Sequence, residues 1–468
     1  MRSSRRWTVG LACTGLLSGG AGCDPTLYGE LADGAGILVL EAPENYPRAG
    51  LGTVVAAYDA QLADGTWQSR VVTSAGPDTP YRVHAIWRGD RVVDRDAHAL
   101  LDGCSDPGDC DVGLGSALLG TAVYQPGMPS EGRLCVLAFA AASDGYHVRC
   151  EVSTDPSSFL PFSGPSMTRF GAAAAPLHGE AGLAVVGAPA AMDRSGALYR
   201  ILATGANAPL AIPERVVPTA GELGASLATA PLPSGRTLVV AGAVRAQTVL
   251  VLSVGSGPPD VHACLRATSM GYGGSLAAGD VTGDGLPEVF VAAPATTPGR
   301  AETVEVYDGA TMPGPLADGS ECPGWGSAPR VLRCTEGLRG VSCAASGFGG
   351  AMAVGDVDAD GTGDLAVGAP RAAVGGTERA GAVFLFRGSS AGLSENAADV
   401  LTHSLPSADA EVGASLAMVR TQLGAGLRAR HEVVAGSPGA NEVLVFLCTG
   451  LDGDDPDVGA RCQPAARP

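Results

Sequence analysis

The sequence predicts an all-β protein, a seven-bladed β-propeller, on three observations. A pair made of an apolar residue and a glycine recurs seven times, beginning at residues 51, 114, 170, 223, 272, 348 and 412. Short apolar runs separated by turn residues follow each pair. With 68 Gly and 33 Pro in 468 residues, 46% hydrophobic and 17% charged, the composition indicates many short strands and tight turns. A β-sandwich needs about 100 residues, so these shorter units favour propeller blades.

The sixth unit is the clearest of the seven. It begins at Phe348-Gly349, continues with an apolar strand at 364–370 that ends in Gly-Ala-Pro, and adds a second strand at 381–386. The third, fourth, fifth and seventh units follow the same plan, whereas the first two are degenerate. Such small residues let neighbouring blades approach closely near the central axis.

These motifs resemble the FG-GAP repeat of the integrin α-subunit N-terminal propeller and its bacterial relatives. The resemblance covers roughly residues 36–447 and is strongest in the third, fifth, sixth and seventh units. It implies seven blades, calcium in some blade loops, and a role in surface binding or adhesion. It implies no particular ligand.

A spaced set of oxygen-bearing residues separates the two motifs of the sixth unit. Carboxylates stand at positions 1, 3, 5 and 9 of residues 356–364, Gly361 permits a sharp turn, and a backbone carbonyl serves at position 7. Calcium takes six to eight oxygen ligands, often from such loops. The expected ligands are Asp356, Asp358, Asp360, Thr362 and Asp364. An EF-hand needs Glu at position 12, where Val367 stands in a strand.

Residues 280–288 of the fifth unit repeat this loop with two changes. Thr282 replaces a carboxylate and Glu288 replaces the last Asp, so the expected ligands are Asp280, Thr282, Asp284, Leu286 and Glu288. The alternative for both loops is an acidic hairpin turn, because Asp-Gly is a common turn pair. We expect two Ca²⁺ sites in adjacent blades on one side of the disc. The sixth-unit site should bind more tightly, because it has more carboxylates.

The N-terminus reads as an export signal. Three arginines precede a short apolar run and a stretch of small residues, so residues 1–22 are predicted to be a signal peptide. Ala21-Gly22-Cys23 resembles a bacterial lipobox, although Gly20 departs from it. We expect Cys23 to carry a lipid and residues 23–35 to link it to the propeller at 36–447. Residues 448–468 form a disulfide-closed acidic tail in this interpretation, and the protein is a monomer of the bacterial envelope or surface.

The cysteines agree with export. Ten remain after Cys13 and Cys23, an even number that indicates five disulfides. The local pairs predicted are Cys104–Cys110, Cys135–Cys150 and Cys448–Cys462. Cys135 and Cys150 flank two apolar runs joined by a turn and are expected on neighbouring strands of one blade. Residues 264, 322, 334 and 343 allow three connectivities, which the sequence leaves open.

Two further expectations concern closure and a tripeptide. The seventh unit is one strand short, so residues 37–40 are expected to pair with the strand at 443–447 and close the ring. Arg88-Gly89-Asp90 is a cell-attachment tripeptide in form, but flanking apolar runs favour a plain hairpin turn.

The net charge and the absence of catalytic motifs exclude several classes of function. The net charge is −18 and lysine is absent, which argues against nucleic acid and anionic membranes as partners. The chain has neither a His-Glu-x-x-His nor a Gly-x-Gly-x-x-Gly motif, so no catalytic residue is singled out. We expect a non-enzymatic, lipid-anchored, calcium-binding module for a surface protein or glycan. The alternatives are a propeller-based polysaccharide hydrolase or lyase, and a purely structural envelope lipoprotein.

Overall fold

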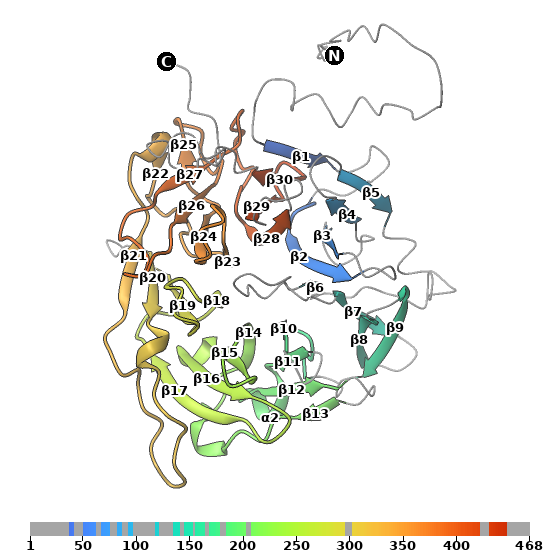
Figure 1. Ribbon diagram of the computed structural model, residues 1–468, viewed down its shortest axis with the longest axis vertical. Helices are drawn as coiled ribbons and strands as arrows, with labels where there is room; N and C mark the ends of the chain where they lie inside the picture. The colour runs from blue at the N-terminus through green and yellow to red at the C-terminus, as the bar shows by residue number, and fades with distance from the viewer. Residues whose placement is uncertain are drawn as a thin grey trace, which may run out of the picture.

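The computed structural model describes residues 37–41, 50–61, 67–74, 82–86, 92–96, 118–120, 134–140, 145–152, 155–163, 168–177, 184–202, 207–294, 302–421 and 430–446. These residues form seven four-stranded sheets and one two-stranded ribbon, and every strand pair is antiparallel. Figure 1 shows the sheets standing around a ring. The all-β class is confirmed, and the sheets equal the sequence repeats in number.

We number the sheets by the repeat that forms them, and the first three come from the N-terminal part. The first sheet contains β2 Val54–Gln61, β3 Trp67–Ser74, β4 Arg82–Ile86 and β5 Val92–Asp96. The second contains β6 Leu118–Gly120, β7 Leu134–Ala140, β8 Gly145–Val152 and β9 Asp155–Ser163. The third contains β10 Ala174–Pro176, β11 Ala184–Ala188, β12 Ala197–Ile201 and β13 Asn207–Pro209.

The remaining sheets carry the best-preserved repeats. The fourth contains β14 Leu223–Pro231, β15 Thr237–Ala243, β16 Thr248–Val254 and β17 Asp260–Arg266. The fifth contains β18 Leu276–Gly279, β19 Glu288–Ala293, β20 Thr303–Tyr307 and β21 Arg330–Arg333. The sixth contains β23 Met352–Gly355, β24 Asp364–Ala369, β26 Ala382–Phe386 and β27 Asp399–Leu401. The seventh contains β28 Ser415–Thr421, β29 Arg430–Ser437 and β30 Glu442–Phe446.

Short elements fill the connections. The ribbon pairs β22 Val341–Ser342 with β25 Ala373–Val374. The α-helix α2 spans only Ala191–Arg194 and contains left-handed residues, so it is a tight turn between strands. The 3₁₀ turns are η4 Glu214–Val216, η5 Val244–Ala246, η6 Gly309–Thr311 and η7 Leu338–Gly340.

The ring closes as the sequence predicts. The N-terminal strand β1, Ile37–Glu41, pairs antiparallel with β30, with Leu40 opposite Val443. It completes the seventh sheet in the order β1-β30-β29-β28. The first strand of each sheet contacts the first strand of the next all the way round, including β28 with β2. Closure of this kind leaves only short outer edges for unwanted pairing.

The core lies between successive sheets rather than at one centre. Five clusters of buried apolar residues lie at the interfaces between the third and fourth, fourth and fifth, fifth and sixth, sixth and seventh, and seventh and first sheets. Strands in the middle of a sheet are therefore covered on both faces. Every residue of β15, β16 and β24 is buried, which explains why these strands are nearly continuous apolar runs in the sequence.

Glycines of the third, fourth, sixth and seventh repeats meet glycines of the following repeat and hold neighbouring sheets together. Phe348 is buried, Gly349 has a φ of 91°, and its N–H donates to the carbonyl of Gly368 at 3.0 Å. Gly368 in turn lies against the seventh sheet, where an added Cβ would stand 2.1 Å from the carbonyl oxygen of Gly413. The same contact joins Gly187 to Gly224 and Gly436 to Gly52. The two motifs of a repeat thus meet the next repeat backbone to backbone.

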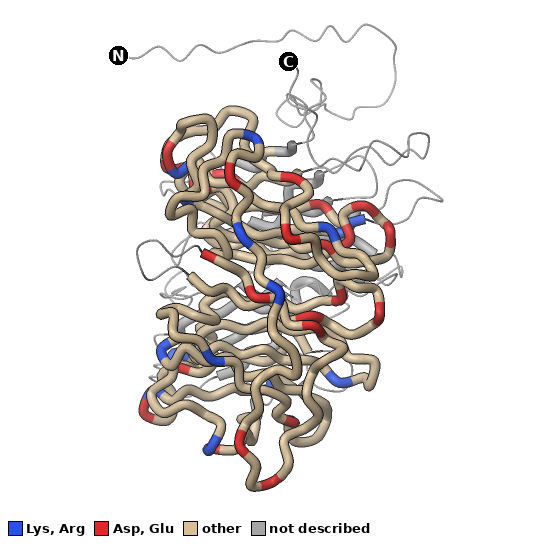
Figure 2. Tube along the Cα trace, turned by 90° about the vertical axis from the view of Figure 1, so that its left-hand side faces the viewer, with Lys and Arg blue, Asp and Glu red and all other residues tan. Residues whose placement is uncertain are grey.

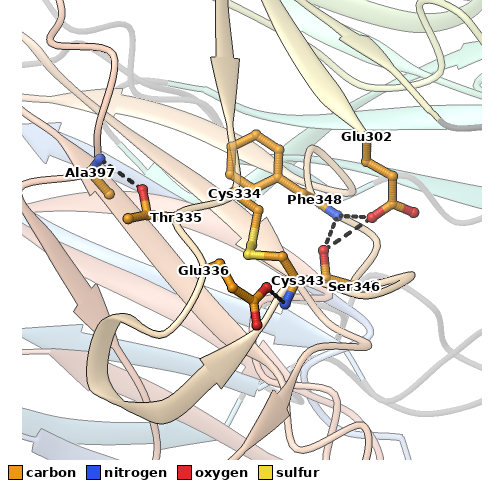
Figure 3. Close-up of a disulfide and its surroundings, with 8 residues drawn as sticks. All are labelled: Glu302, Cys334, Thr335, Glu336, Cys343, Ser346, Phe348 and Ala397. Carbon is orange, nitrogen blue, oxygen red and sulfur yellow. Dashed lines mark hydrogen bonds between the residues drawn. A yellow bond between two sulfur atoms is a disulfide. The ribbon is translucent and has the colours of Figure 1, made fainter. Parts of the chain in front are cut away.

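Two disulfides resolve the connectivity that the sequence leaves open. Cys264 pairs with Cys322, and Cys334 pairs with Cys343, with Cα–Cα distances of 5.7 and 5.8 Å. The second clips the segment that leads from β21 into the sixth unit (Figure 3). Beside it, the Glu302 carboxylate accepts hydrogen bonds from Ser346 Oγ and the Phe348 N–H, each at 3.0 Å.

The backbone register places Cys135 of β7 directly opposite Cys150 of β8. The expectation that these residues lie on neighbouring strands of one blade is therefore confirmed. Their disulfide stays a prediction. It is favoured because the Cα atoms of directly opposite residues lie at a distance that a disulfide can span. Peptide mapping without reductant should recover one cross-linked peptide pair containing residues 135 and 150. A bridge from either of them to a cysteine beyond residue 260 would contradict this pairing.

Several predictions lie outside the described residues. They are the signal peptide at 1–22, the linker at 23–35 with Cys23, the acidic tail at 448–468, and Cys104, Cys110, Cys448 and Cys462. The Arg88-Gly89-Asp90 tripeptide also lies outside, but its flanking strands β4 and β5 pair antiparallel, with Ile86 opposite Val92. Within the described ranges, no helix is both long enough and apolar enough to cross a membrane.

Candidate metal centre

The sixth-unit loop lies between two strands that are already aligned. Gly355, the last residue of β23, pairs with Asp364, the first residue of β24. Asp356 follows β23 directly, so the first and last carboxylates of the loop lie next to each other at its base. Acidic residues are prominent in the loops of the disc when it is viewed from the side (Figure 2).

Three carboxylates converge at this loop. One oxygen each from Asp356, Asp358 and Asp364 lies within 4.8 Å of the others. Asp364 is 1% exposed, and its two oxygens accept hydrogen bonds from the N–H groups of Val357 and Gly388, both at 2.9 Å. These contacts fix the carboxylate in one orientation.

Asp356 provides the strongest indication of a cation. The residue is 7% exposed, and its Oδ2 accepts the Gly361 N–H at 2.9 Å. Its Oδ1 is buried without a hydrogen-bond partner of good geometry. A buried carboxylate oxygen in that condition is costly unless a cation or another donor compensates it. The donor set consists of hard oxygens, which suits Ca²⁺.

One of the predicted carboxylate ligands does not join this cluster. Asp360 is exposed, and its Oδ1 accepts the N–H of Thr362 at 2.7 Å. The cluster therefore uses positions 1, 3 and 9 of the loop, and Asp360 instead stabilises the turn.

Burial perturbs the two inner carboxyls. Removal from water, together with the neighbouring Asp358 charge, raises the pKa of Asp364 to about 7 and that of Asp356 to about 6. The shifts mean that the folded protein holds protons on these groups at a pH where the unfolded chain has released them.

These pKa shifts predict that the stability of the folded protein rises as the pH falls, which is the opposite of ordinary acid denaturation. In the presence of a chelator, the melting temperature should rise as the pH falls from about 8 to about 6, because folding then takes up protons. Saturating calcium should remove this rise, since the metal and the protons compete for the same oxygens. Scanning calorimetry across this pH range measures the effect. Asp356→Asn is the control, and its melting temperature should change less with pH. A chelated protein that loses stability steadily below about pH 8 would contradict the assignment of raised pKa values.

The fifth-unit loop has the same base but a different interior. Gly279 pairs with Glu288, which is 2% exposed. Asp280 accepts backbone N–H groups from Gly283, Gly285 and Thr282 at 2.6, 2.8 and 3.1 Å. Asp284 is exposed and accepts the Leu286 N–H at 2.8 Å. Backbone donors thus occupy the oxygens, and no carboxylate cluster forms here among the described residues.

Burial, together with the Asp280 and Asp284 charges, raises the pKa of Glu288 to about 7. Three of the five predicted residues of this loop nevertheless converge, because Thr282 Oγ1 donates to Asp280 Oδ1 at 3.3 Å and to Glu288 Oε1 at 3.5 Å.

The two loops touch each other. The Gly363 N–H donates to the Asp280 carbonyl at 3.0 Å, and the Ser389 N–H donates to the Val281 carbonyl at 3.1 Å. They therefore lie in adjacent sheets on the same side of the disc. On its other flank the sixth-unit loop bonds to the seventh sheet, because the His431 N–H donates to the Asp356 carbonyl at 2.7 Å and the Asp356 N–H donates to His431 Nδ1 at 3.2 Å. Burial lowers the pKa of His431 to about 4, which keeps the ring neutral.

Two arginines also belong to this region, and the search for acidic motifs missed both. Arg387, the first residue after β26, forms an ion pair with Asp358. In the seventh sheet, Glu432 holds the position of Asp364, four residues before the glycine of the strand motif. Its carboxylate pairs with Arg430, Nε to Oε1 at 2.9 Å, with the two side chains 2% and 6% exposed. A guanidinium thus neutralises the carboxylate at the base of that loop.

One sequence pattern near the site carries no catalytic geometry. Residues 388–392 have the spacing Gly-x-Ser-x-Gly, which in hydrolases marks a strand–turn–helix elbow. Here they lie in the connection from β26 to β27, and the turn is held by Ser389, the neighbour of the motif residue Ser390, whose Oγ donates to the Gly392 carbonyl at 2.8 Å. The pentapeptide is a turn between antiparallel strands.

Comparison with known proteins agrees with the repeat motifs. Residues 272–307 and 348–386 match the FG-GAP repeat family. Human integrin alpha-IIb is 34% identical over 181 residues, which are 37% of this chain and 15% of that protein. A fucose-specific lectin from Aleuria aurantia superimposes with a TM-score of 0.40 and 14% identity, covering 77% of this chain and 99% of the lectin. The fifth and sixth units are thus FG-GAP repeats, and the predicted resemblance to integrin α-subunits is confirmed.

Proposed function

We propose that the protein is an exported, non-enzymatic binding module in which calcium orders the loops on one side of a seven-bladed propeller. The observation that carries the proposal is the cluster of Asp356, Asp358 and Asp364 around a buried oxygen. It lies inside a segment that matches the FG-GAP repeat family. The similarity to an integrin α-subunit supports a surface adhesion or binding role.

The proposal includes finer parts that come from the sequence. Cys23 would carry a lipid anchor in the bacterial envelope, and the partner would be a surface protein or a glycan. A second Ca²⁺ would bind in the fifth-unit loop. Calcium bound only by the folded ring would stabilise it by mass action, since ligand binding to the native state alone raises the free energy of unfolding.

Calcium titration tests the metal and ranks the two sites. Asp356→Asn should remove the tighter of two calorimetric phases, whereas Asp284→Ala should remove the weaker one, because the sixth-unit loop has the formed carboxylate cluster. Calcium at about 100 times its dissociation constant should stabilise the wild type by about 2.7 kcal/mol. Loss of the tighter phase in Asp284→Ala would reverse the ranking. A melting temperature independent of calcium would remove the metal from the proposal.

Partner binding needs a separate experiment. Immobilised protein should retain a surface protein or glycan from envelope extract in calcium, and should release it on chelation. Asp356→Asn is the control, because its retention should be reduced in calcium as well. If the partner were retained equally in chelator and by Asp356→Asn, the proposal of a recognition face ordered by calcium would be contradicted.

A further inference from the structure

The ion pair between Arg387 and Asp358 places a cation of the protein at the sixth-unit loop. Arg387 comes directly after β26, and the next residue, Gly388, donates its N–H to Asp364. The Arg387 and Asp358 side chains are 24% and 16% exposed, so the pair is only partly screened by water. Asp358 contributes to the three-carboxylate cluster at the same time.

We propose that Arg387 is a built-in competitor of the metal, which calcium must displace from Asp358 before that carboxylate becomes a full ligand. The inference rests on the proposed calcium function and adds the residue that sets the affinity. A guanidinium and a calcium ion both need the negative charge of Asp358, so each weakens the hold of the other.

The surroundings give the displaced side chain somewhere to go. An open surface pocket of about 500 Å³ is lined by Arg387, Arg330 and the connection at 388–395, which bonds to the loop through the Gly388 N–H. Arg330 is not available to the carboxylates, because its guanidinium donates to the backbone carbonyls of Leu393 and Ala391. Arg387 can therefore turn into the pocket while Arg330 keeps its wall in place.

The fifth-unit loop lacks such a competitor. Among the described residues, no arginine forms an ion pair with Asp280, Asp284 or Glu288. The sixth-unit loop has one carboxylate more than the fifth, and Arg387 neutralises that surplus. With Arg387 in place, the two loops have similar net charge. Removal of Arg387 should therefore increase the difference between their calcium affinities, with the sixth-unit site binding more tightly.

The test is a calcium titration by calorimetry in an Asp284→Ala background, which isolates the sixth-unit site. Arg387→Gln should lower the dissociation constant for calcium by about tenfold, within the one to three pK units by which a neighbouring arginine changes the proton affinity of an aspartate. Arg387→Lys, which keeps a positive charge, should recover part of the wild-type value. Arg330→Gln is the matched control from the same pocket and should leave calcium affinity unchanged.

Melting temperatures separate competition from a merely structural role. In chelator, Arg387→Gln should melt below the wild type because its carboxylates repel one another, and in calcium it should gain more than the wild type gains. A variant that binds calcium with unchanged or weaker affinity would overturn the inference while leaving the calcium function intact. Absence of calcium binding in the Asp284→Ala parent would instead refute the proposed function of this site, and the competition with it.

Discussion

Replacing Arg430 by methionine is expected to lower the free energy of unfolding by about 3–5 kcal/mol, the range for breaking a buried ion pair from one side. Arg430 and Glu432 lie in β29 with almost no exposure, and methionine keeps an apolar stem of similar length while removing the guanidinium. Glu432 then has to be desolvated without this pairing. Urea denaturation followed by circular dichroism measures the loss.

The double variant Arg430→Met with Glu432→Leu is the control. It removes both charges and should recover most of the stability, because replacing a buried ion pair by apolar residues is often neutral or better. A loss below about 1 kcal/mol in the single variant would show that the pair behaves like an exposed one. Calcium should not rescue the single variant, since residues 420–429 contain no Asp or Glu.

Gly187→Ala should be among the most damaging single-methyl substitutions in the described sheets. The added Cβ would lie 1.9 Å from the carbonyl oxygen of Gly224 and 2.8 Å from its Cα, both backbone atoms of the next sheet. Overpacking of this kind costs about 1–3 kcal/mol, and here a rigid backbone has to shift, so we expect about 3 kcal/mol. Thermal and urea unfolding of the variant measure it.

The fifth unit provides a natural comparison. Ala292 stands there at the place of the strand glycine, and its Cβ would be 3.3 Å from a Cβ built on Gly349. The interface between the fifth and sixth sheets therefore already accommodates a methyl group. Ala292→Gly should cost only about 0.5–1 kcal/mol through backbone entropy. If Gly187→Ala proved as mild as Ala292→Gly, the backbone contact would not be what requires glycine.

The two glycine positions of a repeat show how a local motif encodes an interface. Gly349 needs its positive φ at the start of the repeat, and Gly368 needs the absence of a side chain against the next sheet. Both requirements act on single residues, so they leave a clear trace in the sequence. The first two units were harder to recognise in the sequence, because their glycine motifs are degenerate. Their four-stranded sheets are nevertheless present.

The acidic loops were predicted in part. The spacing of carboxylates pointed to Asp356, Asp358 and Asp364, which the sheet register brings together in one acidic cluster at the loop base. Spacing alone could not separate Asp360, whose carboxylate bonds to its own turn instead. In residues 280–288, the structure places Asp280 and Glu288 on either side of Thr282 Oγ1, whereas Asp284 bonds to its own turn.

By itself, the sequence determined the all-β class, the repeat of apolar-Gly and strand motifs, and the pairing of residues 37–40 into the last sheet. These features follow from short-range patterns and from the need to close a ring of sheets. Only the tertiary structure decided the pairing of Cys264 with Cys322 and of Cys334 with Cys343, and the placement of Arg387 and Arg430 at the carboxylates. Arg387 reaches Asp358 across 29 residues of chain. Local propensity carries no information about such contacts, because they depend on which loops the closed ring brings side by side.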